Sequence, residues 1–195
     1  MLPAPELPPV YEPVPLAPGE DCTQEAARRA RAGAEEGTLL WCGRPGPGRA
    51  RLGEEWLPPS KGLSLGLVLR PEDPLPRAAQ IALVATVALG VAVAEASPAM
   101  TDLRYRWPNN LLLGEGRAAA VDLRAGPPAD WLVLGLHANL AGEPEGVGAA
   151  SLQGETGVDL AAETLLEAFA RHFLAWVTRW DQEGMDPVRR AWQQR

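Results

Sequence analysis

The stretch Trp-Pro-Asn-Asn-Leu-Leu-Leu, residues 107–113, interrupts a strand pattern and then resumes it. Just before it, leucine and aromatic side chains alternate with arginines, which predicts a strand with one buried face. Pro108 cannot donate to a sheet and forces Trp107 into an extended conformation. Asn109 and Asn110 therefore lie at a break between two strands. Their amides either bond the local backbone, in an Asx turn beside a buried Trp107, or face a ligand.

The chain that follows predicts two strands and two helices. Gly-Glu-Gly at residues 114–116 indicates a tight turn, and residues 117–123 are the return strand of a hairpin. Residues 131–140 are apolar and predict a buried strand. The other expected elements are a Gly/Glu loop up to Gly157, an amphipathic helix capped by Asp159 that runs to about Glu183, and a short helix from Asp186.

The chain that precedes the stretch predicts a helix, two strands and a central helix. Asp21, with Gln24 three residues later, indicates a helix start, and Gly37 is expected to end that helix. The predicted strands are residues 38–42 and 62–70, and residues 76–96 predict a helix that is apolar almost all round. This order predicts an α+β domain with a mixed, mostly antiparallel sheet and flanking helices, expected on one side of the sheet.

Composition limits the domain organisation and the class of function. Residues 1–20 contain seven prolines and predict an extended N-terminal arm, and residues 21–195 are expected to form a single domain. The net charge of -7 and the lack of a basic run argue against nucleic acid as a partner. Cys22 and Cys42 are too few for a disulfide framework or a zinc site and are expected to be small buried thiols.

The sequence also predicts where the protein works. The N-terminus lacks the pattern of a signal peptide, and the longest apolar run, residues 81–94, is too short to cross a bilayer. We therefore expect a soluble, cytoplasmic protein with no membrane partner.

A long loop, residues 43–60, carries four glycines and three arginines. Glycines let backbone N–H groups approach an anion, and arginines add bidentate charge, so the loop predicts a cradle for phosphate or carboxylate. A surface loop without a ligand is the alternative. No dinucleotide fingerprint, phosphate loop, Ser/His/Asp arrangement or histidine-rich metal spacing occurs in the sequence. His137 and His172 are isolated and are expected to be structural.

Over roughly residues 21–183 these motifs resemble, in order, the catalytic domain of biotin protein ligases, within the wider biotin/lipoate protein ligase superfamily. Trp107-Pro108-Asn109-Asn110 is similar to the family's Trp-Pro-Asn-Asp. Cys22-Thr23-Gln24 is similar to Ser-Thr-Asn/Gln in the family's biotin pocket. Gly48-Arg49-Ala50-Arg51-Leu52-Gly53-Glu54 is similar to the family's loop Gly-Arg-Gly-Arg-Arg-Gly-Arg, and residues 55–67 resemble the continuation of that loop. Residues 135–139 are similar to Gly-x-Gly-x-Asn.

The resemblance implies a ligand held between the sheet and the arginine-rich loop. Members of the family form biotinyl-adenylate from biotin and ATP with magnesium, and a lysine of a carrier domain then attacks the mixed anhydride. By resemblance, Arg117 and Arg51 are the catalytic candidates and Asn110 is a weak Mg²⁺ ligand. The candidates for binding substrate and nucleotide are Cys22, Thr23, Gln24, Gly48, Arg49, Gly53, Lys61, Trp107, Asn109 and Asn139.

Several positions depart from the family pattern. The catalytic lysine falls on Arg117, the metal-associated aspartate falls on Asn110, and His137 replaces a glycine. The loop has lost two cations and a glycine, at Leu52, Glu54 and Ala50. The resemblance implies ATP-dependent activation of biotin or lipoate and transfer to a carrier-protein lysine. The alternative is a catalytically degenerate relative that only binds the acid, its adenylate or the carrier domain.

Overall fold

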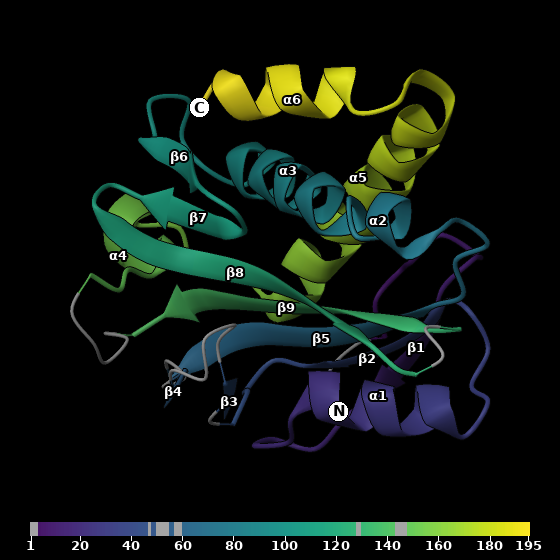
Figure 1. Cartoon of the computed structure of the whole chain (residues 1–195). Helices are drawn as coiled ribbons and strands as arrows, with labels where there is room; N and C mark the ends of the chain where they lie inside the picture. Colours follow the sequence, from purple (N-terminus) through teal and green to yellow (C-terminus); the bar gives the residue numbers. More distant parts are fainter. Residues whose placement is uncertain (1–3, 47, 50–54, 57–59, 128–129, 143–147) are drawn as a thin grey trace.

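A seven-stranded sheet organises the computed structural model, which describes residues 4–46, 48–49, 55–56, 60–127, 130–142 and 148–195. Its strand order is β1-β2-β5-β9-β8-β7-β6, with β1 parallel to β2 and the other neighbours antiparallel, so the predicted mixed sheet is confirmed (Figure 1). The strands of this sheet are β1 (Glu12–Pro15), β2 (Thr38–Cys42), β5 (Lys61–Leu69), β6 (Leu103–Arg106), β7 (Asn110–Leu113), β8 (Gly116–Ala125) and β9 (Leu132–Ala141).

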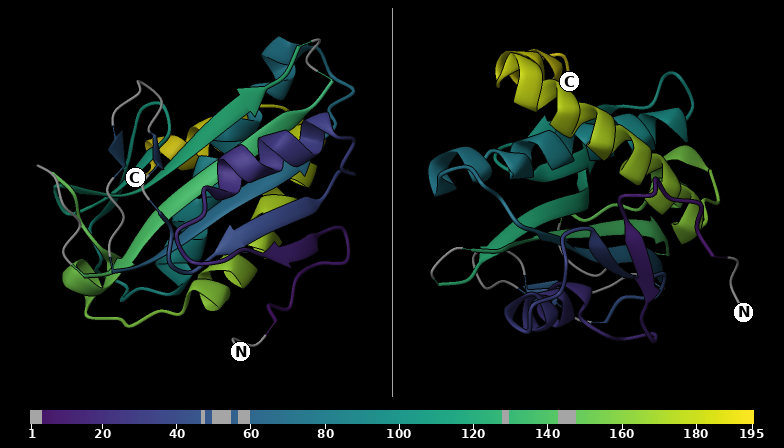
Figure 2. Two further views of the ribbon diagram at one scale, coloured as in Figure 1. Left: turned by 90° about the horizontal axis from the view of Figure 1, so that it is seen from below. Right: turned by 90° about the vertical axis from the view of Figure 1, so that its right-hand side faces the viewer.

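Helices cover both faces of the sheet, so the expectation of helices on one side was wrong. Helix α1 (Cys22–Arg31) lies on one face, and α3 (Ile81–Glu95) and α5 (Ala162–Glu183) lie on the other (Figures 1 and 2). The reason is that β5 is buried on both faces. Its leucines join the large core under α3 and α5, whereas Val68 on the opposite face packs with Ala26 of α1.

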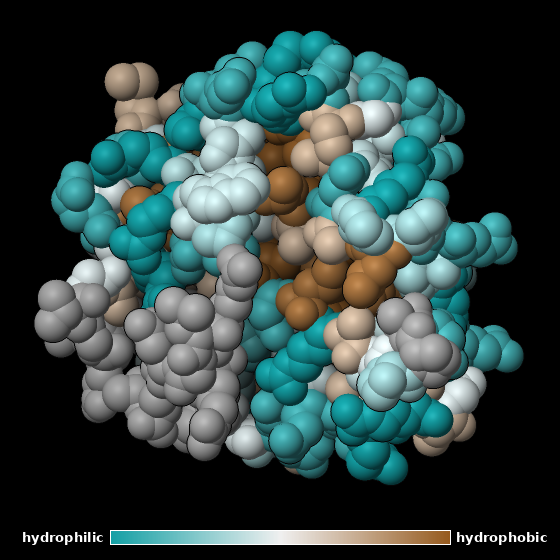
Figure 3. All heavy atoms as spheres, viewed as in Figure 1, coloured by the Kyte–Doolittle hydropathy of each residue, from teal (hydrophilic) through white to brown (hydrophobic). Residues whose placement is uncertain are grey.

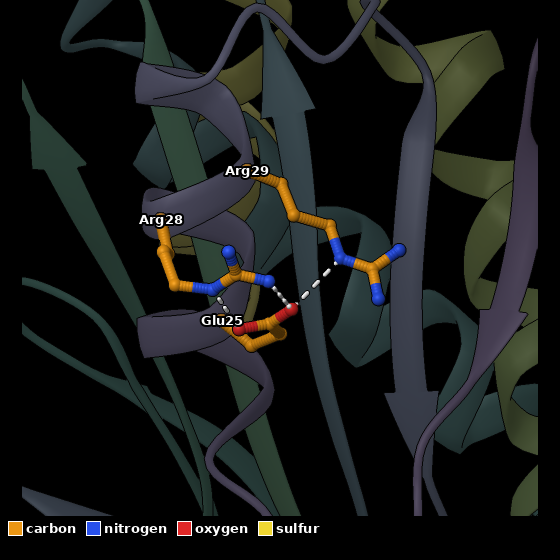
Figure 4. A network of polar contacts seen from close by, with 3 residues as sticks. All are labelled: Glu25, Arg28 and Arg29. Carbon is orange, nitrogen blue, oxygen red and sulfur yellow. Dashed lines mark hydrogen bonds and ion pairs between the residues drawn. The ribbon is translucent and has the colours of Figure 1, made fainter.

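Helix α1 starts where the sequence predicts and ends early. The Asp21 carboxylate accepts a hydrogen bond from the Gln24 N–H at 2.9 Å, which is the expected N-cap. The helix ends at Arg31 rather than near Gly37, and Gly33 just beyond it has φ of +90°. On its outer surface, Glu25 accepts hydrogen bonds from Arg28 and Arg29 (Figure 4).

The predicted central helix is split into α2 (Leu75–Ala78) and α3. By length and composition alone, the helical stretch Leu75–Glu95 could cross a membrane, which corrects the estimate made from residues 81–94. In the fold, 61% of its most apolar window is buried, as in the core helix of a folded domain. Hydrophobic residues nevertheless reach the surface over α3 on the face shown in Figure 3.

The C-terminal third corrects two further expectations. The segment predicted as a loop contains α4 (Leu152–Thr156), whose N-terminus is capped by the Ser151 hydroxyl. Asp159 does not cap α5, which begins at Ala162 after Ala161. The last helix, α6 (Asp186–Gln193), starts where the sequence predicts.

Candidate functional site

Three neighbouring strands present small and polar residues on the face of the sheet that α1 partly covers. Residues directly opposite each other in an antiparallel pair share a face. By this register, β5, β9 and β8 place glycine, serine, histidine and amide side chains beside one another. We call this set the polar floor: Gly62, Ser64, Gly66, Ala120, Asp122, Gly135, His137 and Asn139.

The first turn of α1 lies directly on the polar floor. A Cβ placed on Gly66 would overlap the Cys22 carbonyl, and one on Gly135 would overlap the oxygens of Thr23 and Asp122. Glycine is therefore required at both points for the backbones to approach. The approach also brings the Thr23 hydroxyl, on a fully buried residue, beside Gly135.

Two oxygens beside Gly135 have no hydrogen-bond partner among the described residues. They are the Thr23 hydroxyl and Oδ1 of Asp122. The other carboxylate oxygen of Asp122 accepts from Arg124 Nε at 3.3 Å. Buried polar atoms without partners are uncommon in folded proteins, since each costs free energy unless a ligand or water satisfies it. This pair is therefore suited to polar groups of a bound molecule.

His137 occupies the middle of the polar floor. Its Nδ1 is 3.2 Å from the Ser64 hydroxyl, across the β5–β9 pair. Burial lowers the pKa of His137, although Asp122 and Asp21 oppose the shift, so the ring is neutral near pH 7. A neutral imidazole can offer one donor and one acceptor. Sequence reasoning treated His137 as an isolated structural residue, and the register shows that it faces the candidate site.

A β-bulge brings Arg117 to the same face. Ala119 is opposite Leu111 and belongs to the core, so simple alternation would also turn Arg117 toward the core. The pairing shifts between Leu111 and Leu112, and Arg117 is opposite Leu112 instead, with Ala118 as the extra residue. Arg117 therefore shares a face with Asn110, which is opposite Ala120 of the polar floor.

Asn139 holds the backbone around Arg117. The residue is 3% exposed, and its Nδ2 donates to the Ala150 carbonyl at 2.9 Å and the Arg117 carbonyl at 3.4 Å. The Arg117 N–H donates to the Gly148 carbonyl at 2.6 Å. In the part of the chain that the structure describes, Asn139 Oδ1 has no partner. Asn139 is thus both a backbone anchor and a source of one unpartnered oxygen.

The two asparagines at the strand break differ in role. Asn109 Nδ2 donates to the Val121 carbonyl, and the Asn109 carbonyl accepts from the Val121 N–H at 2.9 Å. The Asn109 amide thus bonds backbone, as in the first alternative, but the backbone is that of β8 and not the local chain of an Asx turn. Asn110 Nδ2 donates to Asn109 Oδ1 at 3.2 Å, which leaves the Asn110 carbonyl oxygen as the possible ligand atom.

Two predicted site residues lie apart from the polar floor. The expected burial of Trp107 was wrong: the residue is 70% exposed, and its ring meets the edge of Trp192 in α6, with 6.0 Å between ring centroids. The reason is that β6, the outermost strand, ends at Arg106, so Trp107 lies beyond the paired strands. Lys61 Nζ is 2.5 Å from Asp159 Oδ1, an ion pair with the segment before α5.

The remaining predicted residues belong to the helix start and the long loop. Cys22 is fully buried, and Gln24 is exposed. Within the loop, β3 (Gly48–Arg49) pairs with β4 (Glu55–Trp56) in a small antiparallel sheet of two strands. Arg51 and Gly53 lie outside the described residues. Whether the loop arginines converge with Arg117 therefore stays a prediction.

The structure offers little for holding a metal ion by protein alone. Among the described residues, no group of three His, Cys, Asp or Glu side chains could hold one. The predicted ligand Asn110 is a neutral oxygen donor, and Mg²⁺ prefers carboxylates together with substrate phosphates. The residues present fit an ion that arrives with a nucleotide better than a resident ion.

Sequence reasoning quoted Ser64, Gly66 and Gly135 only within segments similar to the family, and it named neither these residues nor Asp122 as site residues. The signal was present in β5, where leucines alternate with glycine and serine. These small residues could be assigned to the candidate site only from the register, which places Gly66 opposite Gly135 and Ser64 opposite His137. That register depends on strand order, which residue spacing alone does not determine.

A separate cavity of about 470 Å³ lies at the other end of the domain, between the segment that precedes β1, the end of β5, and the helices α2 and α5. Its lining is mostly apolar and includes Tyr11, Phe173 and Trp180. Burial raises the pKa of Tyr11 to about 12. None of the predicted site residues lines this cavity, so the polar floor remains the candidate site.

Comparison with known proteins places the fold in a family. The profile of the biotin/lipoate A/B protein ligase family matches residues 56–194. The chain belongs to this family. It is 36% identical, over 74% of its length, to a biotin–[acetyl-CoA-carboxylase] ligase from Paracoccus denitrificans, and 26% identical, over 88%, to the bifunctional ligase/repressor BirA of Bacillus subtilis. It spans only 65% and 55% of the length of these two curated relatives.

Solved structures agree on the fold. A biotin protein ligase-like protein of unknown function from Silicibacter sp. TM1040 superposes with a TM-score of 0.80 at 26% identity, covering 97% of this chain and 80% of that one. The biotin protein ligase from Aquifex aeolicus in complex with biotin and ATP gives a TM-score of 0.76 at 21% identity, covering 90% and 74%. At that identity, the second likeness concerns the fold alone.

Proposed function

We propose that this protein activates biotin or lipoate with ATP to the acyl-adenylate and transfers the acyl group to a lysine of a carrier protein. In the first step, a carboxylate oxygen of the acid attacks the α-phosphorus of ATP, and pyrophosphate leaves. In the second, the lysine amine attacks the acyl carbon, and AMP leaves. Family membership and the Paracoccus ligase support this chemistry. We also propose that the reaction occurs in the cytoplasm.

The observation that carries the proposal is the bulge at Ala118. It places a permanent cation, Arg117, on the same sheet face as His137 and the unpartnered oxygens of the polar floor. Activation of a carboxylate needs positive charge to spread over carboxylate and phosphate oxygens in a site that excludes water. Arginine supplies that charge through a planar fork that matches both groups. The neutral His137 adds no competing charge.

The polar floor and the first turn of α1 together also support an acid with a polar head group. The Thr23 hydroxyl and Asp122 Oδ1 can accept hydrogen bonds, and the hydroxyl can also donate one. A ureido ring presents two N–H donors and a carbonyl, whereas a dithiolane ring presents none of these. The floor therefore favours biotin over lipoate as the acid.

ATP–pyrophosphate exchange with biotin and with lipoate tests the proposed activity. Arg117→Ala should lower kcat/KM, with a loss of about 2 to 4 kcal/mol of transition-state stabilisation, because one preorganised charge donor is removed. Arg117→Lys is the matched control, since it keeps the charge and should retain more activity. Wild-type activity that is unchanged in Arg117→Ala would exclude Arg117 from the reaction.

A catalytically degenerate relative that only binds the acid, its adenylate or the carrier domain is the second candidate. The neutral donor at Asn110, where a carboxylate would hold Mg²⁺ better, favours it. Asn110→Asp should raise magnesium-dependent exchange. The degenerate candidate is correct if the wild type shows a thermal shift with biotin but no exchange, and if the double variant Asn110→Asp/Arg117→Lys recovers exchange. If neither protein shows exchange or a shift, the ligand assignment is wrong.

A further inference from the structure

The only two cysteines in the sequence, twenty residues apart, meet in the fold. Cys22 is the first residue of α1, and Cys42 is the last residue of β2. Their Sγ atoms are 3.6 Å apart, and the two residues are 0% and 3% exposed. Both thiols are free. An oxidised pair would need the sulfurs to approach by roughly 1.5 Å, to a bond of about 2.05 Å.

The two thiols differ in acidity. Hydrogen bonds from the Cys22 S–H and from the Arg44 backbone N–H lower the pKa of Cys42, although burial and the nearby Glu20 and Asp21 oppose this. The pKa of Cys22 is raised, first because its thiol donates to Cys42 and then because it is buried. Thiolate is the reactive form of cysteine. Cys42 is also the more exposed of the two, at 3% against 0% for Cys22, and it lies at the end of its strand. Exposure and acidity therefore both favour Cys42 as the nucleophile and Cys22 as the resolving thiol.

The pair is joined to the candidate site through α1. The Cys22 carbonyl lies against Gly66 of the polar floor, and the next residue, Thr23, contributes an unpartnered hydroxyl. A bond between the sulfurs would pull the first turn of α1 toward the end of β2. The glycine contact leaves this turn little room to move without shifting Thr23.

We propose that Cys22 and Cys42 form a redox-active dithiol that peroxide oxidises to a disulfide. The disulfide weakens binding of the acid at the polar floor. The Cys42 thiolate attacks one peroxide oxygen, the O–O bond breaks, and protonation of the departing hydroxide gives water and a Cys42 sulfenic acid. The Cys22 sulfur then attacks the sulfenyl sulfur and releases a second water. The two thiols lose two electrons and two protons, and hydrogen peroxide is reduced to two waters. The effect on acid binding rests on the proposed function; formation of the disulfide does not.

Intact-mass measurement tests the first part. The folded, reduced protein is treated with hydrogen peroxide, and any remaining thiols are then alkylated with N-ethylmaleimide under denaturing conditions. We expect a product that has lost two hydrogens, takes up no alkylating agent and returns to two alkylated thiols after dithiothreitol. Peptide mapping should join the peptides that contain Cys22 and Cys42. Two alkylatable thiols after peroxide treatment, or only disulfides between chains, would overturn the proposal.

Two matched variants test the order of the steps, after a thermal melt shows that each is folded. When the Cys22→Ser variant is treated with peroxide and dimedone, which traps sulfenic acids, dimedone should label Cys42, because no resolving thiol remains. The wild type should be labelled little, since the disulfide forms first. Cys42→Ser should be labelled more slowly than Cys22→Ser. Faster labelling of Cys42→Ser would overturn the assignment of Cys42 as the nucleophile.

Biotin titrations of the reduced and the oxidised protein test the consequence. Oxidation should weaken the thermal shift and raise Kd roughly tenfold or more, because displacing a positioned group by about 1 Å has effects of that size or larger. Dithiothreitol should restore binding. If the reduced protein does not bind biotin or lipoate, the proposed function fails while the mass result still decides whether the dithiol closes. If both forms bind equally, the link to the site is wrong.

Discussion

Single residues at the contact between α1 and the sheet set the shape of the candidate site. Gly66 is the clearest case, because its neighbours are the Cys22 carbonyl and the Ala26 Cβ, the latter only 2.7 Å from an added Cβ. A backbone carbonyl cannot rotate away as a side chain can. A methyl group at this position therefore displaces the first turn of α1, which carries Thr23.

Gly66→Ala should accordingly lower the free energy of unfolding by about 1 to 3 kcal/mol, the usual cost of overfilling a packed interior. The cost should be visible as a lower denaturant midpoint with an unchanged m-value. Biotin binding should weaken as well. Ala27→Gly, at another buried position of α1, provides a comparison in which helix stability falls but no overlap with β5 is created. An unchanged midpoint in Gly66→Ala would contradict the close approach.

At the scale of elements, α1 shows how a helix can be held to the sheet by one face and stabilised by charge on the other. Its inward residues are alanines, which allow close packing on Val68 and Val133. Its outer face carries Glu25 between Arg28 and Arg29 (Figure 4). Hydrogen bonds from Arg28 and then Arg29 lower the pKa of Glu25 from 4.5 to about 2.

The stabilisation from Glu25 should depend on pH in a defined direction. Because the folded-state pKa is below the unfolded value of 4.5, the contribution is complete above that pH and is lost as pH falls toward about 2. Since Arg28 is largely exposed, we expect less than about 1 kcal/mol. Measuring unfolding of wild type and Glu25→Gln from pH 7 to pH 2 should show a difference that shrinks below pH 4.5. A difference that grows on acidification would contradict the assignment.

The sequence predicted elements better than it predicted their faces. Alternating leucines located β5, and the pair Asp21 and Gln24 located the start of α1, because both signals are local. The side on which α1 packs could not be predicted, since β5 is buried on both faces and its small residues suit either a helix or a ligand. The exposure of Trp107 was missed because it depends on where the outermost strand ends.

At the scale of the whole molecule, the core lies between the sheet and the helices α3 and α5. Leu67 of β5 is fully buried in it and is opposite Leu39 on β2 and Leu134 on β9. Leu67 lies on the face of β5 opposite to the polar floor. A defect at Leu67 should therefore lower global stability before it changes the site.

Leu67→Ala should reduce the free energy of unfolding by about 2 to 5 kcal/mol, which is the range for removing a buried leucine side chain. Leu67→Asp should be at least as harmful, because it leaves a buried carboxyl without a partner. Leu75→Ala, at a residue that is 47% exposed, is the matched control and should cost far less. Equal effects at the two positions would remove Leu67 from the core.

The extra residue in β8 has a consequence for how this chain can vary in length. Ala118 is the residue that the pairing with β7 leaves out, so its loss would restore a regular ladder in which Arg117 directly precedes Ala119 and still lies on the site face. Losing a residue from the regularly paired part of β8, between Ala119 and Ala125, would instead turn the side chains on one side of the deletion to the opposite face of the sheet. The damage from a single-residue deletion in this strand should therefore depend on its position, and it should be smaller at Ala118 than within the regular ladder.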